Sequence, residues 1–235
     1  MQTNSIQTRE IDSFKSKLRE SLTKETLPCR TVKLAKHTNV YLSGDKSDLV
    51  YFIETGEIKL LMLSPEGKEC LLAIHSFGDI FGELGIGRLG ERLESATAMT
   101  DTQLKVIPSI KFLEHLSKEA LLVGFVKYLA ARVEEQQQVI ANLVTVDSEQ
   151  RLGKTLLQLA KTIGKKYSYG TVIELKISHE ELSEMIGTTR PRTSMFMQNF
   201  RNFGLITLTK ERHIIVNEQK LLYYLAQLRA QPKCE

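Results

Sequence analysis

Hydrophobic and polar positions follow three different rhythms along the 235 residues. In the stretch 5–22, apolar residues return every three to five positions, which predicts an amphipathic helix on the surface of a domain. From about Arg30 to Val106, short apolar runs alternate with glycine-containing turn sequences. From Ser117 onward the spacing is again that of a helix. These rhythms predict a helix, then a β-rich domain, then a mainly helical remainder.

The β-rich segment contains short runs suited to strands: NVYL, LVYFI, EIKLLML, ECLLAI and QLKVI. The turn sequences between and after them are SGDK, ETGE, SPEGKE, SFGD and GIGRLGER, in which glycine supplies the positive φ angles of tight reversals. Strands spaced about 8–12 residues apart are typical of a small sandwich or barrel. We therefore expect an all-β sandwich or jelly-roll barrel here.

A heptad seam runs along the long helix expected from Ser117. Its members step alternately by four and three residues, and they are Leu122, Val126, Leu129, Val133, Gln136, Ile140 and Leu143. Such a seam can pack on its own domain or against the same helix of a second chain. Because the seam is narrow, and because a polar seam residue such as Gln136 can set the register of two chains, we expect self-association through this helix.

Beyond a break at 146–148, the chain resumes with an amphipathic helix, which we expect Ser148 to cap and Gly164 to end. The sequence YSYGTVIELKI then predicts a hairpin. GLITLTKERHIIVN predicts two strands joined by a charged turn, and EQKLLYYLAQLRA predicts a final helix.

Between these elements, ISHEELSEMIGTTRPRTSMFMQNFRNFGLI predicts two helices joined by a glycine turn, which describes a helix-turn-helix. Ser178 and Glu181 have the spacing of a capping box. Gly187 ends the first helix, and Pro191 suits the first turn of the second. Thr188 and Thr189 offer cap hydroxyls, and the expected apolar stripes are Leu182, Met185 and Ile186, then Met195, Phe196 or Met197, Phe200 and Phe203.

The second of these helices has a cationic outer face, with no Asp or Glu from Thr188 to Gly204. Arginines on a helix often form only a solvated face. In a helix-turn-helix, however, the first residues of the second helix meet base edges, and Arg190 could fork onto guanine O6 and N7. The candidate DNA contacts are Thr188, Thr189, Arg190, Arg192, Ser194, Gln198 and Arg201, with Lys210 and Arg212 in the turn between the last two strands.

Composition narrows the function classes further. The net charge of +4 is mildly basic, so the local distribution of charge must decide about a nucleic-acid partner. Cys29, Cys70 and Cys234 are scattered, which predicts free thiols and neither a zinc site nor an iron–sulfur cluster. No signal peptide or membrane span is expected, so we expect a cytoplasmic protein. GIGRLGE lacks the lysine of a phosphate-binding loop, and nothing predicts an enzyme.

The order of these features resembles the family of the cyclic-AMP receptor protein and FNR. The resemblance rests on FGDIFGEL, with Gly82, Glu83 and Leu84, on the long helix, and on the helix-turn-helix ending in GLI; it spans Leu34 to Val216. It implies an α+β fold with an N-terminal β-roll (a cyclic-nucleotide-binding-like jelly roll), a long dimerisation helix and a C-terminal winged helix-turn-helix. The corresponding ranges are 1–116, 117–146 and 147–235. It further implies a homodimeric transcription regulator that binds pseudo-palindromic double-stranded DNA and contacts RNA polymerase.

The expected effector pocket departs from the cyclic-AMP binders of that family. Their Gly-Glu-Leu segment holds the ribose, and an Arg-Ser-Ala segment clamps the phosphate. Here Glu94 stands in place of the clamping arginine, and a carboxylate repels phosphate. Arg92, two residues earlier, could substitute, and two glutamines replace the Thr-Ser that reads adenine. The candidate pocket residues are Gly82, Glu83, Leu84, Arg92, Ser95, Ala96, Gln136 and Gln137.

Cyclic AMP is therefore not the expected effector, and neither is haem, because a lone histidine such as His75 is more often structural. No N-terminal cysteine cluster like that of FNR precedes Cys29. In the recognition helix Arg190 matches the family's leading arginine, whereas Pro191 and Met195 replace its later glutamate and arginine, so Arg192 would have to compensate. A cyclic-nucleotide-responsive regulator, or a ligand-binding module acting on a protein partner, remains an alternative.

Overall fold

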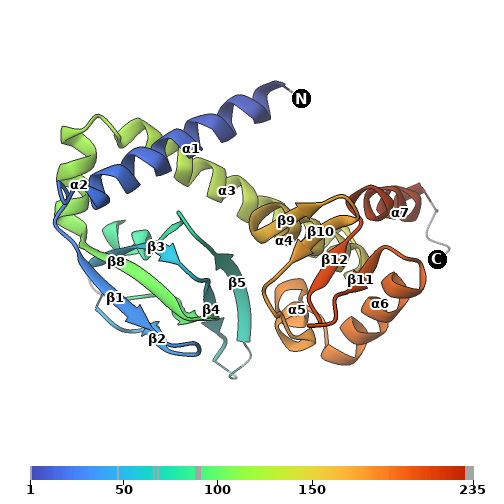
Figure 1. The fold of residues 1–235 in the computed structure, drawn as a ribbon. Coiled ribbons are helices and arrows are strands. Elements are labelled where there is room, and N and C mark those ends of the chain that lie inside the picture. Colours follow the sequence, from blue (N-terminus) through green and yellow to red (C-terminus); the bar gives the residue numbers. More distant parts are fainter. Residues whose placement is uncertain (1, 47, 66, 68, 88–90, 231–235) are drawn as a thin grey trace. The chain divides into compact units, whose positions relative to one another are not determined.

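The structure is a computed structural model that describes residues 2–46, 48–65, 67, 69–87 and 91–230 (Figure 1). By its internal contacts the chain divides into two compact units, Met1–Gln137 and Gln138–Glu235. Among the described residues, no helix combines the length and apolar character needed to cross a membrane. The expected division at 116 and 146 stays a prediction.

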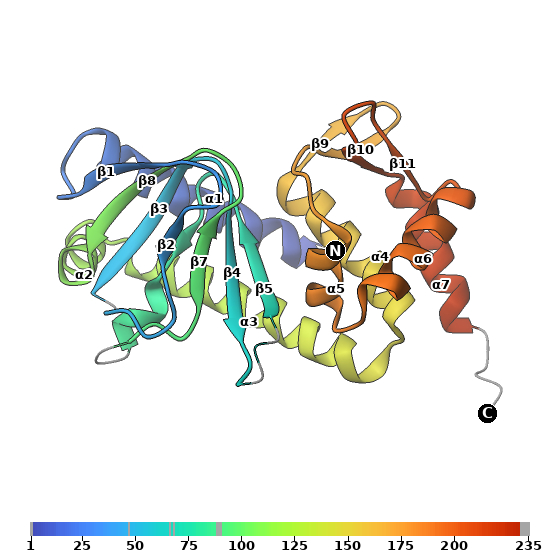
Figure 2. The ribbon, with the colours of Figure 1, turned by 90° about the horizontal axis from the view of Figure 1, so that it is seen from below.

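The first unit contains two antiparallel four-stranded sheets (Figure 2). One has the order β1-β8-β3-β6 and the other β2-β7-β4-β5. Side chains from both sheets, such as Tyr41, Phe81 and Leu104, share one buried cluster, so the sheets face each other across it. The strands are β1 (Arg30–Leu34), β2 (Asn39–Tyr41), β3 (Leu49–Thr55), β4 (Ile58–Leu63), β5 (Glu69–His75), β6 (Ile80–Phe81), β7 (Ser95–Ala98) and β8 (Thr102–Pro108).

The five strand runs expected from the sequence are all present, which confirms the β-rich domain. Strands β1, β6 and β7 were not expected. β7 has the sequence SATA, whose small side chains give a weak apolar signal, yet Ala96 and Ala98 are fully buried. A 3₁₀ helix, η1 (Glu83–Gly87), follows β6. Parts of the expected turns at 64–69 and 85–92 lie outside the described residues.

Helices cover one side of the roll. Helix α1 (Gln2–Thr23) buries Phe14, Leu18 and Leu22, which confirms its amphipathic character. Two further helices follow the strands, α2 (Ser109–Lys118) and α3 (Leu122–Thr145). The expected single helix from Ser117 is thus wrong at its start. The chain breaks at Ala120, whose φ of 53° is a left-handed conformation that alanine seldom adopts. Because this position is not a glycine, the sequence did not predict the break.

The second unit is a small antiparallel sheet of order β11-β12-β10-β9 packed with helices. The expected hairpin, the two later strands and the final helix are confirmed. Asp147, and not Ser148 as expected, caps the first helix, because its carboxylate accepts the Gln150 amide at 2.8 Å. The elements are α4 (Ser148–Ile163), β9 (Gly164–Tyr167), β10 (Gly170–Ile173), α5 (His179–Ile186), α6 (Arg190–Asn202), β11 (Ile206–Leu208), β12 (Ile214–Val216) and α7 (Glu218–Ala230).

Two of the three cysteines lie in the described residues, and they are free thiols, as expected. Cys29 is partly buried and Cys70 is exposed. Cys234 lies outside the described residues. Burial raises the pKa of the Cys29 thiol, which keeps it protonated and unreactive at neutral pH.

Candidate nucleic-acid interface and sensor pocket

The turn between α5 and α6 forms as its local sequence predicts (Figure 1). Ser178 and Glu181 make both hydrogen bonds of a capping box: Ser178 Oγ accepts the Glu181 amide at 3.1 Å, and Glu181 Oε2 accepts the Ser178 amide at 2.9 Å. Gly187 follows α5 with a φ of 61°, which only glycine adopts without strain. The chain therefore turns sharply into α6 after a well-defined helix end.

Helix α6 begins after Thr189, with Pro191 in its first turn as expected. The expectation of a hydroxyl cap is wrong, because the Thr189 side chain makes no capping hydrogen bond. An N-cap hydroxyl accepts a hydrogen bond from the backbone N–H of the second or third residue of the helix. Pro191 is the second residue of α6 and has no N–H, so one of these two donors is missing. The Thr189 side chain is exposed and Thr188 is partly exposed. Both hydroxyls therefore lie at the start of α6 beside Arg190.

The buried stripe of α6 consists of Phe196, Met197 and Phe200, as expected. Met195 and Phe203 were expected in it as well, but they are 52% and 59% exposed. Met195 comes directly before the buried pair Phe196 and Met197 in the sequence. Phe203 is the C-cap residue, and the centre of its ring lies 5.7 Å from the centre of the Tyr224 ring. The helix is thus held by a narrow stripe, which leaves most of its circumference uncovered.

The outer face of α6 carries positive charge without any acid. Arg190, Arg192, Gln198 and Arg201 are exposed, whereas Ser194 is partly buried, with its Oγ 2.8 Å from His179 Nδ1. A hollow of about 380 Å³ opens between α6 and β11, lined by Gln198, Arg201, Asn202, Ile206, Thr207 and Leu208. Arg190, Ser194, Gln198 and Arg201 thus lie at helical spacing on one face of α6, whereas Arg192 is exposed on another side of the helix.

Lys210 and Arg212 lie in the turn between β11 and β12 and are exposed. Arg212 has a φ of 68°, and its amide donates to the Thr209 carbonyl at 3.0 Å, so the turn is tight. The two strands and this turn form the expected wing of the motif. Both cations therefore stand at the tip of the wing.

In the first unit, the Gly82–Leu84 segment follows β6. Gly82 has a φ of 78°, and a Cβ at this position would lie 2.8 Å from Arg92 Nη1. Glu83 is buried, and its Oε1 lies 3.3 Å from Arg132 Nη1, whereas Leu84 is 54% exposed. Of the three residues expected in the pocket, Gly82 and Glu83 therefore lie in the interior of the roll, and Leu84 does not.

Arg92 is turned inward and is 4% exposed. Its Nη1 donates to the Gly82 carbonyl at 2.7 Å and its Nη2 to the Leu49 carbonyl at 2.6 Å. The guanidinium also lies 4.3 Å from the centre of the Tyr41 ring. The charge expected to be available to an effector is thus engaged by the protein's own groups.

Glu94 is also internal, with 2% exposure. Its Oε1 accepts a hydrogen bond from the Tyr41 hydroxyl at 2.9 Å. Burial and the nearby Glu94 carboxylate raise the pKa of Tyr41 far above its ordinary value, so the phenol stays a donor. Arg92, Glu94 and Tyr41 form one internal polar group, which we call the roll cluster.

Of the remaining pocket candidates, Ser95 and Ala96 lie next to the roll cluster, because Ala96 pairs with Tyr41 between β2 and β7. Ala96 is buried in β7, and the Ser95 hydroxyl accepts the Ser43 amide at 3.0 Å. Gln136 and Gln137 on α3 are exposed, and neither side chain hydrogen-bonds to another described residue. The structure thus joins Gly82 to Arg92 but leaves the glutamines in solvent.

Sequence reasoning missed Arg132, which links α3 to the roll. Its guanidinium donates to the Ile80 carbonyl at 2.9 Å and to His75 Nε2 at 3.0 Å, and it pairs with Glu83. Arg132 lies one turn after Tyr128, whose hydroxyl also donates to the Ile80 carbonyl, at 3.0 Å, but no local pattern in the sequence points to either contact. His75 is therefore held as a structural residue, as expected.

Asp79 extends this network to α1. Its Oδ1 accepts Lys15 Nζ at 2.6 Å, and its Oδ2 lies 3.7 Å from His75 Nδ1. Burial alone raises the pKa of Asp79, but the hydrogen bond with His75 and the charge of Lys15 outweigh it, so the pKa falls well below its usual range. Asp79 is thus a permanent anion that joins α1 to the roll.

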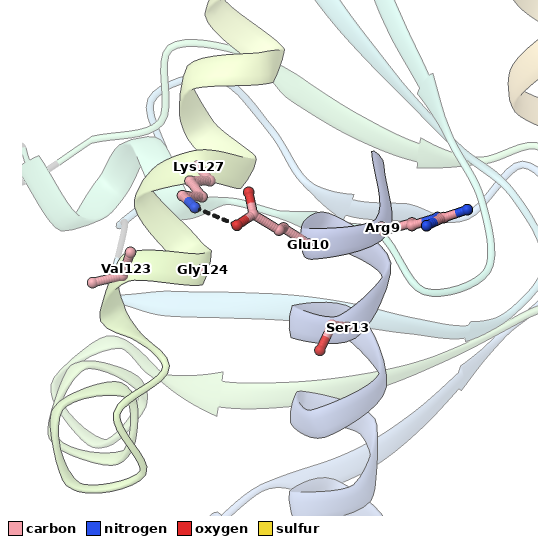
Figure 3. Close-up of a pocket in the computed structure, with 6 residues that line it drawn as sticks. All are labelled: Arg9, Glu10, Ser13, Val123, Gly124 and Lys127. Carbon is pink, nitrogen blue, oxygen red and sulfur yellow. Dashed lines mark hydrogen bonds and ion pairs between the residues drawn. The ribbon is translucent and has the colours of Figure 1, made fainter. Parts of the chain in front are cut away.

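A second hollow, of about 400 Å³, lies between α1 and α3 (Figure 3). Glu10 and Lys127 cross it as an ion pair at 2.7 Å. Gly124 allows close packing there, because a Cβ would lie 3.0 Å from Phe14 Cβ. It is lined by Arg9, Glu10, Ser13, Val123, Gly124 and Lys127, none of which belongs to the expected effector pocket.

Arg92→Met is expected to destabilise the first unit by about 1–3 kcal/mol, because the substitution keeps the volume but leaves the Leu49 and Gly82 carbonyls without their charged donor. Urea unfolding followed by circular dichroism measures the change. The control is Lys36→Met, at an exposed side chain. Equal stability of the two variants would contradict the structural role of Arg92.

Comparison with known proteins agrees with this architecture. Residues 31–119 match the family described as "Cyclic nucleotide-binding domain", and residues 150–224 match "Crp-like helix-turn-helix domain". A "CRP-like cAMP-activated global transcriptional regulator" of Mycobacterium tuberculosis is 27% identical over 202 residues, which are 86% of this chain and 89% of that protein. A "Global nitrogen regulator" of Synechococcus elongatus is 28% identical over 195 residues, 81% and 87% of the two chains.

Among solved structures, a variant of CooA from Carboxydothermus hydrogenoformans superimposes with a TM-score of 0.69 at 27% identity, covering 84% of this chain and 88% of that one. A sensor-like roll, a long helix and a winged helix-turn-helix define a transcription regulator and not an enzyme. The chain belongs to the CRP/FNR family of these regulators.

Proposed function

We propose that the protein is a homodimer that reads a pseudo-palindromic site in double-stranded DNA with the α6 helix of each protomer. The observation that carries this is the exposed, acid-free face of α6, led by Arg190 at the helix start. Positive charge at a helix N-terminus, together with free hydroxyls at Thr188 and Thr189, suits phosphate and base edges. Lys210 and Arg212 would contact the backbone beside it.

The dimer proposal rests on the uncovered apolar seam of α3. Leu122, Val126, Val133, Ile140 and Leu143 are 45–61% exposed. Leu129 is the exception, because it packs against the core of its own unit. Apolar side chains repeating over several turns are costly to leave in water, and a second copy of the same seam would cover them. Two protomers would present two recognition helices to neighbouring half-sites.

We propose an effector other than cyclic AMP, or a roll that needs none. In the roll cluster, both Nη atoms of Arg92 are bound to carbonyls of the roll, and Glu94 is a buried carboxylate, which repels a phosphate. Gln136 and Gln137, the adenine-reading candidates, are exposed on α3. Haem is not proposed, since the His75 ring is engaged by Arg132.

The partners that complete this proposal are double-stranded DNA and, as the family resemblance implies, RNA polymerase, in the cytoplasm. A module that acts only through protein–protein contacts is the competing function. The acid-free face of α6 favours DNA, because a cationic helix without counter-charges matches a polyanion better than a mixed protein surface.

Selection of bound DNA from a random duplex pool tests the proposal. We expect enrichment of a two-fold symmetric sequence with half-sites about one helical turn apart. Affinity for it should fall by about a thousandfold or more between 50 and 200 mM salt if six or more phosphates are contacted. Added cyclic AMP should leave the affinity unchanged. Failure to enrich any sequence, with or without a metabolite extract, would refute the DNA-binding function.

A further inference from the structure

His179 is the first residue of α5, yet its ring lies against the recognition helix. Its Nδ1 is 2.8 Å from the hydroxyl of Ser194. Ser194 is flanked at helical spacing by Arg190 and Gln198, so these three residues share one face of α6. The imidazole is partly exposed and borders the surface that we propose for DNA. No residue expected from the sequence to contact DNA comes from α5.

The surroundings of His179 disfavour its charged form in the free protein. Burial lowers the pKa of His179 from its ordinary value, and the positive charge of Arg190 lowers it further. Helix α4 also packs on α5, but its Arg151 binds the Ile186 carbonyl at the opposite end of the helix. The ring is therefore neutral at pH 7 and has an uncompensated cation as its neighbour.

Acidic groups on α5 itself do not offset this. Glu181 is engaged with Ser178 in the capping box, Glu180 is exposed, and Glu184 lies more than one helical turn beyond His179. The lowering of the His179 pKa comes from burial and the charge of Arg190. An anion placed against this surface would be the missing partner of both Arg190 and an imidazolium.

Resting on the proposed function, we infer that His179 is a further DNA-contacting residue, which binds a backbone phosphate as an imidazolium. In that state both ring nitrogens donate: Nδ1 to the Ser194 hydroxyl oxygen and Nε2 to a phosphate oxygen. The Ser194 hydroxyl proton is then free to donate to a DNA acceptor. Binding of DNA thus takes up one proton from solvent at the His179 of each protomer that engages a half-site.

Proton uptake makes the affinity depend on pH with a defined sign. Phosphate raises the pKa of His179 in the complex above its lowered value in the free protein. The affinity therefore rises as pH falls from above the bound-state pKa toward the free-state pKa, by at most tenfold per pH unit for one proton. Above the bound-state pKa, His179 contributes no pH dependence.

The test measures affinity for the selected duplex by fluorescence anisotropy from pH 5.5 to 8.0 at constant ionic strength. The wild-type protein is expected to bind about three- to tenfold more tightly at pH 6 than at pH 8. His179→Gln, which can hydrogen-bond but cannot titrate, should lose this rise. His179→Arg should bind with no pH dependence, at pH 8 as tightly as the wild-type protein does at pH 6.

His213→Gln is the comparison variant, because His213 is the other histidine of the second unit and lies in the turn of the wing, next to Arg212. This variant should keep the wild-type pH dependence, and circular dichroism at pH 5.5 checks that each variant is folded. If the rise persists in His179→Gln, or disappears only in His213→Gln, the inference is wrong while DNA binding stands. If the wild-type protein binds no duplex at any pH, the proposed function itself fails and the inference falls with it.

Discussion

Arg190→Ala is expected to abolish the preference for the selected operator while leaving the protein folded. Arg190 is exposed at the first position of α6, where a guanidinium can bind guanine O6 and N7 together. Loss of one such bidentate contact costs about 1–3 kcal/mol, or roughly 5- to 150-fold in affinity for the preferred base. In a dimer bound to two half-sites, this free-energy cost is doubled. Competition between the operator and a scrambled duplex measures it.

Lys210→Ala is the control for this experiment, because its exposed side chain stands in the wing and would contact phosphate only. It should weaken operator and scrambled duplex alike and reduce the slope of log affinity against log salt by about one per half-site. If Arg190→Ala kept the same footprint at similar affinity, guanine reading by Arg190 would be refuted.

The double variant Val133→Asp and Ile140→Asp is expected to convert the protein to a monomer. These residues are 56% and 61% exposed on one seam of α3, so the substitutions leave the cores of both units intact and place charges where a second copy would pack. A monomer engages one half-site at a time, which should lower operator affinity by about a hundredfold or more. Analytical ultracentrifugation and anisotropy measure the two effects.

Gln138→Asp is the matched control, since Gln138 is exposed on the same helix but lies outside the seam. It adds one of the two charges of the double variant at a position outside the seam, and it should leave the mass in solution unchanged and the affinity within about twofold. A wild-type protein that sediments as a monomer, or a double variant that stays dimeric, would contradict the use of this seam.

The helix-turn-helix could be anticipated almost residue by residue because its signals are local. A cap at Ser178 with Glu181 three residues later, a helix end at Gly187 and a proline at 191 each act within one turn of the chain. The errors lie where tertiary packing competes with local pattern. Thr189 does not cap, and Phe203 packs on Tyr224 beyond the stripe.

In the first unit, by contrast, the contacts of the candidate pocket could not be predicted from the sequence. Short apolar runs predicted most strands. The inward orientation of Arg92 could not be predicted, because its partner Leu49 is 43 positions away in the sequence. The link from Arg132 to Ile80 spans 52 positions. Whether an arginine in this roll is offered to a ligand or to the protein's own carbonyls depends on such distant neighbours.

The sequence by itself determined most of the elements, the recognition motif and the spacing of the seam, since each depends on propensities and spacings within a few residues. Only the tertiary structure decided that Arg92 turns inward onto the Gly82 and Leu49 carbonyls, that Arg132 joins α3 to the roll, and that His179 lies against Ser194. The physical reason is that burial and charge pairing are properties of groups brought together by folding, and a linear pattern does not state which groups will meet.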